Sequence, residues 1–109
     1  MLNRAALSNV ELIKSTAKRV WGDNAEFGEM EILDRPYSEF VWPMRLYGKV
    51  EILLAYDRST LSIGIPTENG RVTLRSIAKA TVYWGFDALQ PENLLHNFKV
   101  LDRVVKAMK

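Results

Sequence analysis

The single histidine is the first residue to consider for catalysis, because the 109 residues contain only His96 and no cysteine. Nucleophilic catalysis built on a Ser-His or Cys-His pair would therefore have to use His96. On the helix expected around it, His96 shares the polar side with Lys99, Arg103 and Lys106. The pattern therefore indicates a solvated surface histidine rather than a catalytic base.

A pair of carboxylates offers a second kind of chemistry. Glu29 and Glu31 are two residues apart on an expected strand, which places them about 7 Å apart on one face, a spacing compatible with a glycosidase-like pair or a cation site. Their alternation with Met30 and Ile32 turns both toward solvent, where charges on an edge strand also discourage aggregation. Phosphate-binding loops, HExxH, GxSxG and CxxC are all missing from the sequence. We therefore predict no enzyme, no metal site and no cofactor.

Acidic side chains are concentrated in residues 23–39, which carry six acids and one base and so a net charge of −5. Such a block can attract a basic partner and set specificity more than affinity. The positions that we predict as an acidic partner surface are Glu26, Glu29, Glu31 and Glu39.

Basic and aromatic residues interleave on a second predicted surface, the open face of a sheet. Its expected partner-binding positions are Arg45, Tyr47, Lys49, Leu53, Arg71, Arg75, Ile77, Lys79 and Tyr83. Cations that follow phosphates and tyrosines that stack on bases are typical of single-stranded nucleic-acid binding. The apolar Leu53 and Ile77 on the same face favour a protein interface or a homodimer contact. We therefore predict a protein partner and keep nucleic acid as the alternative.

The elements that must position these residues begin with an amphipathic helix. Apolar residues recur at spacings of three and four over residues 2–20, and Gly22 follows as a stop. Ser8 and Glu11 have the spacing of a capping box, which predicts a well-formed helix over residues 9–21.

After Gly22 the apolar period changes from helical to two, which is the period of a strand. The alternation predicts strands at residues 29–32, 40–42, 44–57 and 61–65. Pro43 indicates an edge, a bulge or a strand start. Turns are expected at residues 34–37 and 57–59, and Asn69-Gly70 is a strong hairpin signal because both residues tolerate positive φ.

Residues 71–84 fit both a strand and a helix, because apolar residues recur in this segment at both periods. The preceding Asn-Gly turn and the β-favouring residues 81–84 favour a strand.

The C-terminal segment fits only one kind of element. Pro91 suits the first helical position, and the apolar stripe from Leu94 to Met108 predicts a helix.

These elements together predict an α+β fold in a single domain over residues 1–109. An N-terminal helix, an antiparallel meander of about five strands and a C-terminal helix follow one another in the order α-β-β-β-β-β-α, with both helices on one face of the sheet. The tryptophans Trp21, Trp42 and Trp84 fall on positions assigned to the core or its rim, so we expect them to be core anchors.

The composition is that of a folded soluble protein, with 48% hydrophobic residues and a net charge of +2. No apolar run approaches the ~20 residues of a membrane span, and the N-terminus lacks an apolar signal core. The absence of cysteine suits a reducing compartment. We therefore expect a cytoplasmic protein that neither enters nor crosses a membrane.

The predicted function is that of a small non-enzymatic protein-binding protein, such as an inhibitor, immunity protein, chaperone or adaptor. It would act through the open sheet face or the acidic block, with a nucleic-acid-binding module as the alternative. The order of helix, meander and helix is similar to that of small secretion-chaperone-like and immunity-protein-like domains, although a shared topology does not fix function.

Overall fold

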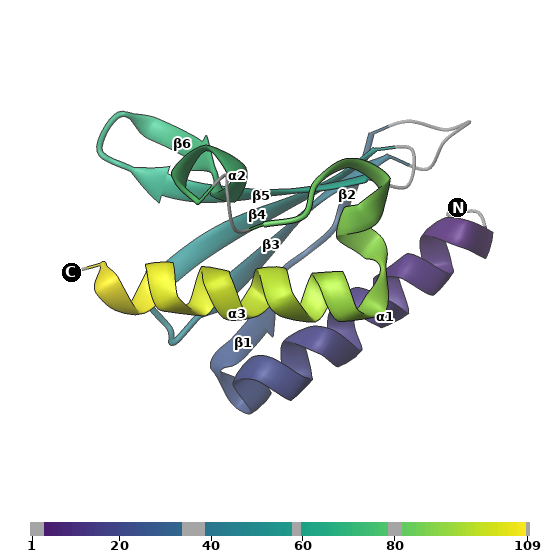
Figure 1. Cartoon of the computed structure of the whole chain (residues 1–109), viewed down its shortest axis with the longest axis horizontal. Helices are drawn as coiled ribbons and strands as arrows, with labels where there is room; N and C mark the ends of the chain where they lie inside the picture. The colour runs from purple at the N-terminus through teal and green to yellow at the C-terminus, as the bar shows by residue number, and fades with distance from the viewer. Residues whose placement is uncertain (1–3, 34–38, 58–59, 79–81, 109) are drawn as a thin grey trace.

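The chain adopts the α+β architecture that the sequence predicts, with an N-terminal helix, an antiparallel sheet and a C-terminal helix (Figure 1). The structure is a computed structural model and describes residues 4–33, 39–57, 60–78 and 82–108. The helices are α1 (Arg4–Trp21), the single-turn α2 (Leu74–Ile77) and α3 (Pro91–Ala107), with 3₁₀ turns η1 (Gly22–Asn24) and η2 (Gly85–Leu89).

All strand pairs of the sheet are antiparallel. The strands are β1 (Ala25–Phe27), β2 (Glu31–Ile32), β3 (Phe40–Leu46), β4 (Val50–Asp57), β5 (Thr60–Thr67) and β6 (Gly70–Thr73). Their spatial order is β1-β3-β4-β5-β6, and β2 pairs with β3 beyond the point where β1 ends. Consecutive strands from β3 onward are neighbours, so this part of the sheet is the predicted meander.

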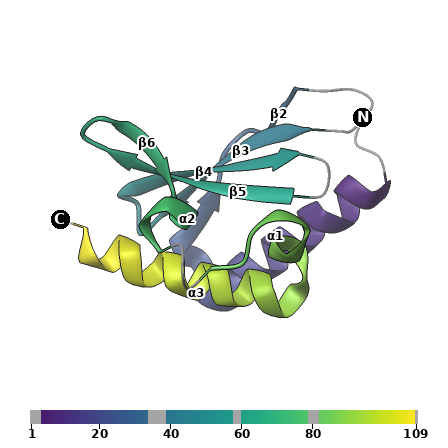
Figure 2. The ribbon, with the colours of Figure 1, turned by 45° about the horizontal axis from the view of Figure 1, so that its top comes forward.

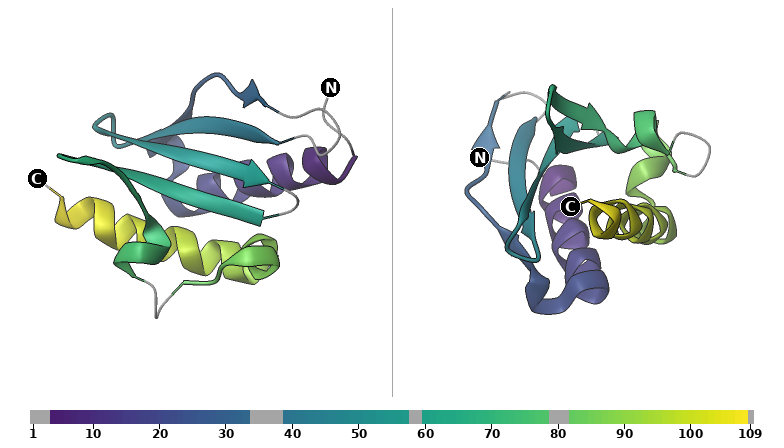
Figure 3. Two further views of the ribbon diagram at one scale, coloured as in Figure 1. Left: turned by 90° about the horizontal axis from the view of Figure 1, so that it is seen from above. Right: turned by 90° about the vertical axis from the view of Figure 1, so that its left-hand side faces the viewer.

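The long helices α1 and α3 lie side by side on one face of the sheet and leave the other face open (Figures 2 and 3). The core between them is formed by alternate residues of the strands and by the apolar stripes of the helices. On β4, Ile52 and Leu54 have no exposed surface, whereas Glu51 and Asp57 are exposed. Burying each such aliphatic side chain contributes about 1.5–3 kcal/mol, so the one-sided strand pattern directs α1 and α3 to this face.

The single long strand predicted over residues 44–57 is wrong, because a hairpin divides it. β3 ends at Leu46, β4 begins at Val50, and these two residues pair with each other. Tyr47 and Gly48 form the turn with φ values of 57° and 64°. A strand cannot contain two residues with positive φ, so Tyr47 leaves the open face to which the sequence assigned it.

Pro43 lies inside β3, where the sheet is interrupted on one side. The Gly28 N–H donates to the Pro43 carbonyl over 2.9 Å, which shows that Pro43 directs its backbone groups toward the break between β1 and β2. The indole Nε1 of Trp42 donates to the Gly28 carbonyl over 2.9 Å. The missing N–H of proline therefore lies on the side away from β4, where neither β1 nor β2 has a residue paired with Pro43.

The strand predicted over residues 71–84 is also wrong. β6 ends at Thr73, and α2 follows at once. The Thr73 hydroxyl accepts a hydrogen bond from the Ser76 N–H over 3.2 Å, so Thr73 is the N-cap of α2. This local cap removes Arg75, Ile77 and Tyr83 from the sheet.

Two smaller expectations also fail. Helix α1 already includes Arg4, so Ser8 and Glu11 lie inside the helix and form no capping box at its start. Ala6 is fully buried, and tertiary packing of this kind stabilises the extra turn. Trp21 and Trp42 are core residues as predicted, but Trp84 is 58% exposed.

Two turns were predicted, at residues 34–37 and 57–59. Residues 34–37 and 58–59 of these turns, together with Lys79 of the predicted partner surface, lie outside the described residues. Within the part of the chain that the structure describes, no helix has both the length and the apolar character needed to cross a bilayer.

Candidate partner-binding site

The open sheet face retains three of the nine positions predicted for it, namely Arg45, Leu53 and Arg71. Its cations are paired. Arg45 Nη2 lies 3.9 Å from Glu51 Oε2, and Arg71 Nη2 lies 3.7 Å from Glu51 Oε1. Arg71 also donates from Nη1 to the Glu51 carbonyl over 3.0 Å. The face therefore carries a neutralised row of charges rather than a basic track.

The predicted acidic surface is not a single compact group. Glu26 on β1 is opposite Arg45, and Glu31 on β2 is opposite Val41, so both lie on the open face. Glu29 lies in the connection between β1 and β2, and Glu39 is only half exposed just before β3. Glu29 and Glu31 therefore do not share a strand face as predicted.

Tyr47 belongs to a polar cluster on the helix side of the sheet. The Tyr47 hydroxyl and the Trp21 Nε1, the latter over 2.9 Å, both donate to Oδ1 of Asp102. Lys106 Nζ lies 3.1 Å from Asp102 Oδ2, one helical turn further along α3. These four side chains, which we call the Asp102 cluster, join α1, α3 and the β3–β4 turn. Lys49 is exposed in the same turn.

The pKa shifts of the Asp102 cluster explain its chemistry. Partial burial alone would raise the pKa of Asp102, but hydrogen bonds from Tyr47, Trp21 and Lys106 outweigh it and hold that pKa below its usual value. The hydrogen bond to Asp102 raises the pKa of Tyr47, and the same carboxylate raises the pKa of Lys106. Asp102 therefore remains ionised and Tyr47 protonated at neutral pH, which suits a structural joint better than proton transfer.

The remaining predicted residues, Arg75, Ile77 and Tyr83, gather around a different feature. The Arg75 guanidinium carbon lies 3.9 Å from the ring centroid of Trp84. The Ile77, Tyr83 and Trp84 side chains are 49%, 46% and 58% exposed. Large exposed apolar side chains are thus concentrated between α2 and η2.

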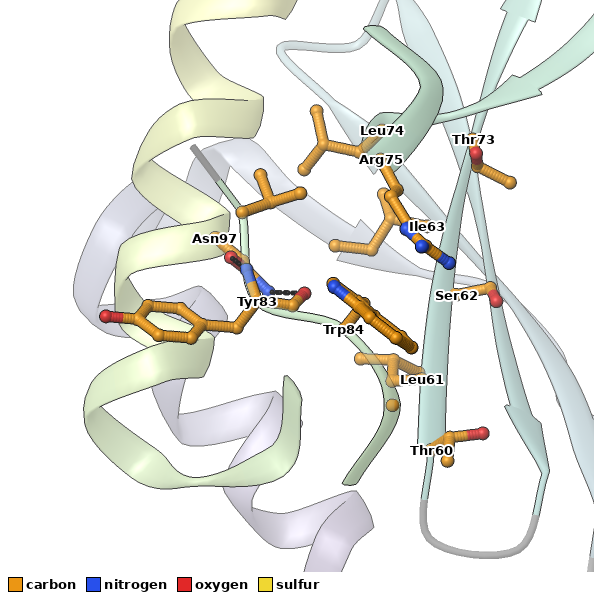
Figure 4. A pocket seen from close by; sticks show the side chains of 12 residues that line it. Thr60, Leu61, Ser62, Ile63, Thr73, Leu74, Arg75, Tyr83, Trp84 and Asn97 are labelled. Carbon is orange, nitrogen blue, oxygen red and sulfur yellow. Dashed lines mark hydrogen bonds between the residues drawn. The ribbon is translucent and has the colours of Figure 1, made fainter. Parts of the chain in front are cut away.

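A pocket of about 230 Å³ opens beside Trp84 and is called here the Trp84 pocket (Figure 4). It is lined by residues 60–63 of β5, residues 73–75 at the start of α2, residues 82–85 and Asn97 of α3. The Trp84 ring points toward β5, whereas the Tyr83 ring points the opposite way. Within the described residues, no carboxylate lies within ion-pair distance of Arg75.

Asn97 fixes the backbone beside this pocket. Its Oδ1 accepts from the Tyr83 N–H over 2.9 Å, and its Nδ2 donates to the Tyr83 carbonyl over 3.0 Å. Asn97 is 3% exposed, so its amide is buried, and it is matched to both backbone polar groups of Tyr83. This pair of bonds anchors the irregular chain before Trp84 to α3 and holds the indole at the pocket.

The residues considered for catalysis do not form a catalytic or metal-binding group among the described residues. His96 is exposed on α3, and its ring packs edge-on against Tyr83 with centroids 5.5 Å apart. The described residues include no group of three or more His, Cys, Asp or Glu side chains that could hold a metal ion. Comparisons with known protein families, curated proteins and solved structures find no match for this chain.

Sequence reasoning missed the structural settings of Trp84, Asn97 and Asp102. Asn97 follows Leu94 by three residues and precedes Leu101 by four, which places an amide on the apolar stripe of α3. A polar residue on a buried stripe must find hydrogen-bond partners, and this was the available signal. Asp102 precedes Lys106 by four residues, but nothing in the sequence indicates Tyr47 as its second partner.

Proposed function

We propose that this chain is a non-enzymatic protein-binding protein and that its partner binds at the Trp84 pocket. The observation that carries the proposal is the stacking of Arg75 on an exposed Trp84, with no described carboxylate paired to the guanidinium. Tryptophan, tyrosine and arginine are the residues most enriched in interface hot spots. A partner that covers Trp84 would bury its apolar ring, and a partner carboxylate would complete the pairing of Arg75.

The rigidity of the site supports the same proposal. The Asn97 amide holds the backbone at Tyr83 in place, and the guanidinium of Arg75 lies on the Trp84 ring. Ordering these groups before the partner arrives reduces the entropy lost on binding. An inhibitor, immunity protein, chaperone or adaptor would use such a pocket in the same way, and the lack of cysteine suits a cytoplasmic location.

The nucleic-acid alternative has less support. Arg45 and Arg71 are both close to Glu51, and Tyr47 is directed into the Asp102 cluster. A face that binds single strands needs accessible cations beside stacking rings. The open sheet face does not combine accessible cations with stacking rings, so we do not propose it as a nucleic-acid surface.

Affinity capture with matched variants tests the proposal. Full-length wild-type protein and the Trp84→Ala and Arg75→Glu variants are used to capture partners from a nuclease-treated lysate of the source cells. Affinity for the purified partner is then measured. We expect Trp84→Ala to weaken binding by about 2 kcal/mol, or roughly thirtyfold, as for a hot-spot residue.

The matched control is Lys14→Glu, because Lys14 is an exposed cation on α1. This reversal should leave partner affinity within about threefold of wild type. Partner binding that is equally strong in wild type, Trp84→Ala and Arg75→Glu would contradict the proposed site. A partner captured from an untreated lysate but lost after nuclease treatment would favour nucleic acid instead.

A further inference from the structure

One edge of β5 is only half covered by its neighbour. β6 pairs with β5 only over residues 64–67 and then turns into α2 after Thr73. Residues 60–63 of β5 pair with β4 on one side, and no strand of the described residues pairs with them on the other. These are the β5 residues that line the Trp84 pocket.

The direction of the backbone groups along this edge follows from the β5–β6 hairpin. Thr67 and Gly70 close a two-residue turn as a pair, so their backbone groups bond to each other. Because this direction alternates along a strand, the N–H groups of Leu61 and Ile63 point the same way as that of Thr67. Within the described residues, neither a strand nor another hydrogen-bond acceptor pairs with these two N–H groups.

Leu61 and Ile63 hold this edge in position. The two residues are 7% and 6% exposed, and both belong to the core. The unpaired backbone groups therefore belong to a rigid strand that can act as a template for an added strand. Four residues of added strand would extend about 13 Å along the edge.

We propose that an extended segment of the partner adds to β5 at residues 60–63 and places a carboxylate on Arg75. This inference rests on the proposed function and specifies its binding mode. The backbone of the segment would bond to the N–H groups of Leu61 and Ile63, and one of its side chains would cover Trp84. The positive charge of Arg75, unpaired among the described residues, selects an aspartate or glutamate in the segment.

The probe for this mode is a display library of random twelve-residue peptides. Peptides are selected on the full-length protein and counter-selected on the Arg75→Glu variant. We expect the enriched peptides to combine β-branched or aromatic residues at alternate positions with an aspartate or glutamate. Replacing that acid by lysine should weaken the peptide's binding to the wild-type protein at least tenfold. The same lysine peptide should bind the Arg75→Glu variant. The Lys14→Glu variant should bind the original peptide as tightly as wild type does.

Backbone chemistry distinguishes an added strand from a ligand that only fills the pocket. Methylating alternate peptide nitrogens should weaken binding at least tenfold in one register and by less than about threefold in the other, because only alternate N–H groups face β5. In the free protein, the Leu61 and Ile63 amides should exchange faster with solvent than those of Ser62 and Gly64, which point toward β4. Peptide binding should slow the exchange of the Leu61 and Ile63 amides at least tenfold.

Three results would overturn the inference: no enriched peptide, binding that tolerates methylation in both registers, or unchanged exchange at Leu61 and Ile63. Edge-to-edge pairing of two copies of this chain, seen as a dimer whose formation protects these amides, would also overturn it. A lysate partner that requires Trp84 while the peptides fail would leave the proposed function intact and refute only the added strand.

Discussion

The Asp102 cluster and the Trp84 pocket use similar side chains to different ends. Each places a cation beside an aromatic ring, with Lys106 Nζ 6.0 Å from the Tyr47 ring centroid in the first and Arg75 over Trp84 in the second. The difference is a carboxylate. Asp102 receives hydrogen bonds from its aromatic neighbours and lies against Lys106, whereas no described carboxylate pairs with Arg75.

This difference separates a finished contact from an unfinished one. In the Asp102 cluster every charge has its partner within the chain, and Trp21 is 4% exposed. In the Trp84 pocket the ring is 58% exposed, and the cation needs an anion from outside the described residues. A closed cluster of this kind stabilises the fold, and an open one is available for binding.

The two tryptophans give the largest expected contrast. Trp21→Ala should cost about 3–5 kcal/mol of unfolding free energy, because the ring is buried and packs against Phe98 with centroids 5.1 Å apart. Trp84→Ala should cost less than about 1 kcal/mol. Denaturant unfolding of both variants measures the difference. Equal losses would show that Trp84 is a structural residue and would remove the contrast.

The carboxylate itself gives the next largest effect. Asp102→Ala should cost about 1–3 kcal/mol, because the Trp21 Nε1 and the Tyr47 hydroxyl lose their acceptor. Arg75→Ala should change unfolding free energy by less than about 1 kcal/mol. Urea titrations of the two variants beside wild type measure these changes. If Asp102→Ala is as stable as wild type, the cluster does not join the helices to the sheet.

The acid dependence of stability sharpens the same point. The pKa of Asp102 is lower in the folded chain than in the unfolded one, so the unfolded state takes up the proton first as pH falls. The stabilisation is complete above the unfolded value of about 4 and is lost as pH falls through the lower folded pKa. Asp102→Asn should make the unfolding free energy depend less steeply on pH below pH 4 than it does in wild type. An unchanged slope in that variant would assign the acid dependence to other carboxylates.

The smallest expected effects concern residues that the sequence offers for catalysis. His96→Ala should leave partner affinity within about twofold of wild type, because His96 packs against the Tyr83 ring, which points away from the Trp84 ring. The double variant Glu29→Gln, Glu31→Gln should keep full biological activity. A loss of about a hundredfold in either folded variant would indicate a missing general acid or base and would refute a non-enzymatic protein.

The covered face of the sheet could be predicted from the sequence because it depends on local periodicity. Ile52 and Leu54 alternate with polar or half-buried residues, and Leu94, Phe98 and Leu101 recur at helical spacing. Each of these residues is fully buried. A period of two or of 3.6 directs side chains to one face whatever the rest of the chain does, so fold class and core followed directly.

The β3–β4 turn was hidden by the same periodicity. Leu46 and Val50 are four residues apart, an even number, and as a strand pair they point to the same face. A three-residue turn therefore leaves the alternation unbroken, and residues 44–57 are indistinguishable from one long strand. Tyr47 is also an uncommon residue at positive φ, so the sequence carried no strong turn signal there.

The sequence by itself determined the α+β class, the one-sided sheet and the two terminal helices, because these depend on patterns within each element. Only the tertiary structure decided which surface is open for a partner. Arg75 and Trp84 are nine residues apart, and Asp102 meets Tyr47 across 55 residues. Whether a charge finds its counterion within the chain depends on such long-range contacts, and spacing along the sequence does not encode them.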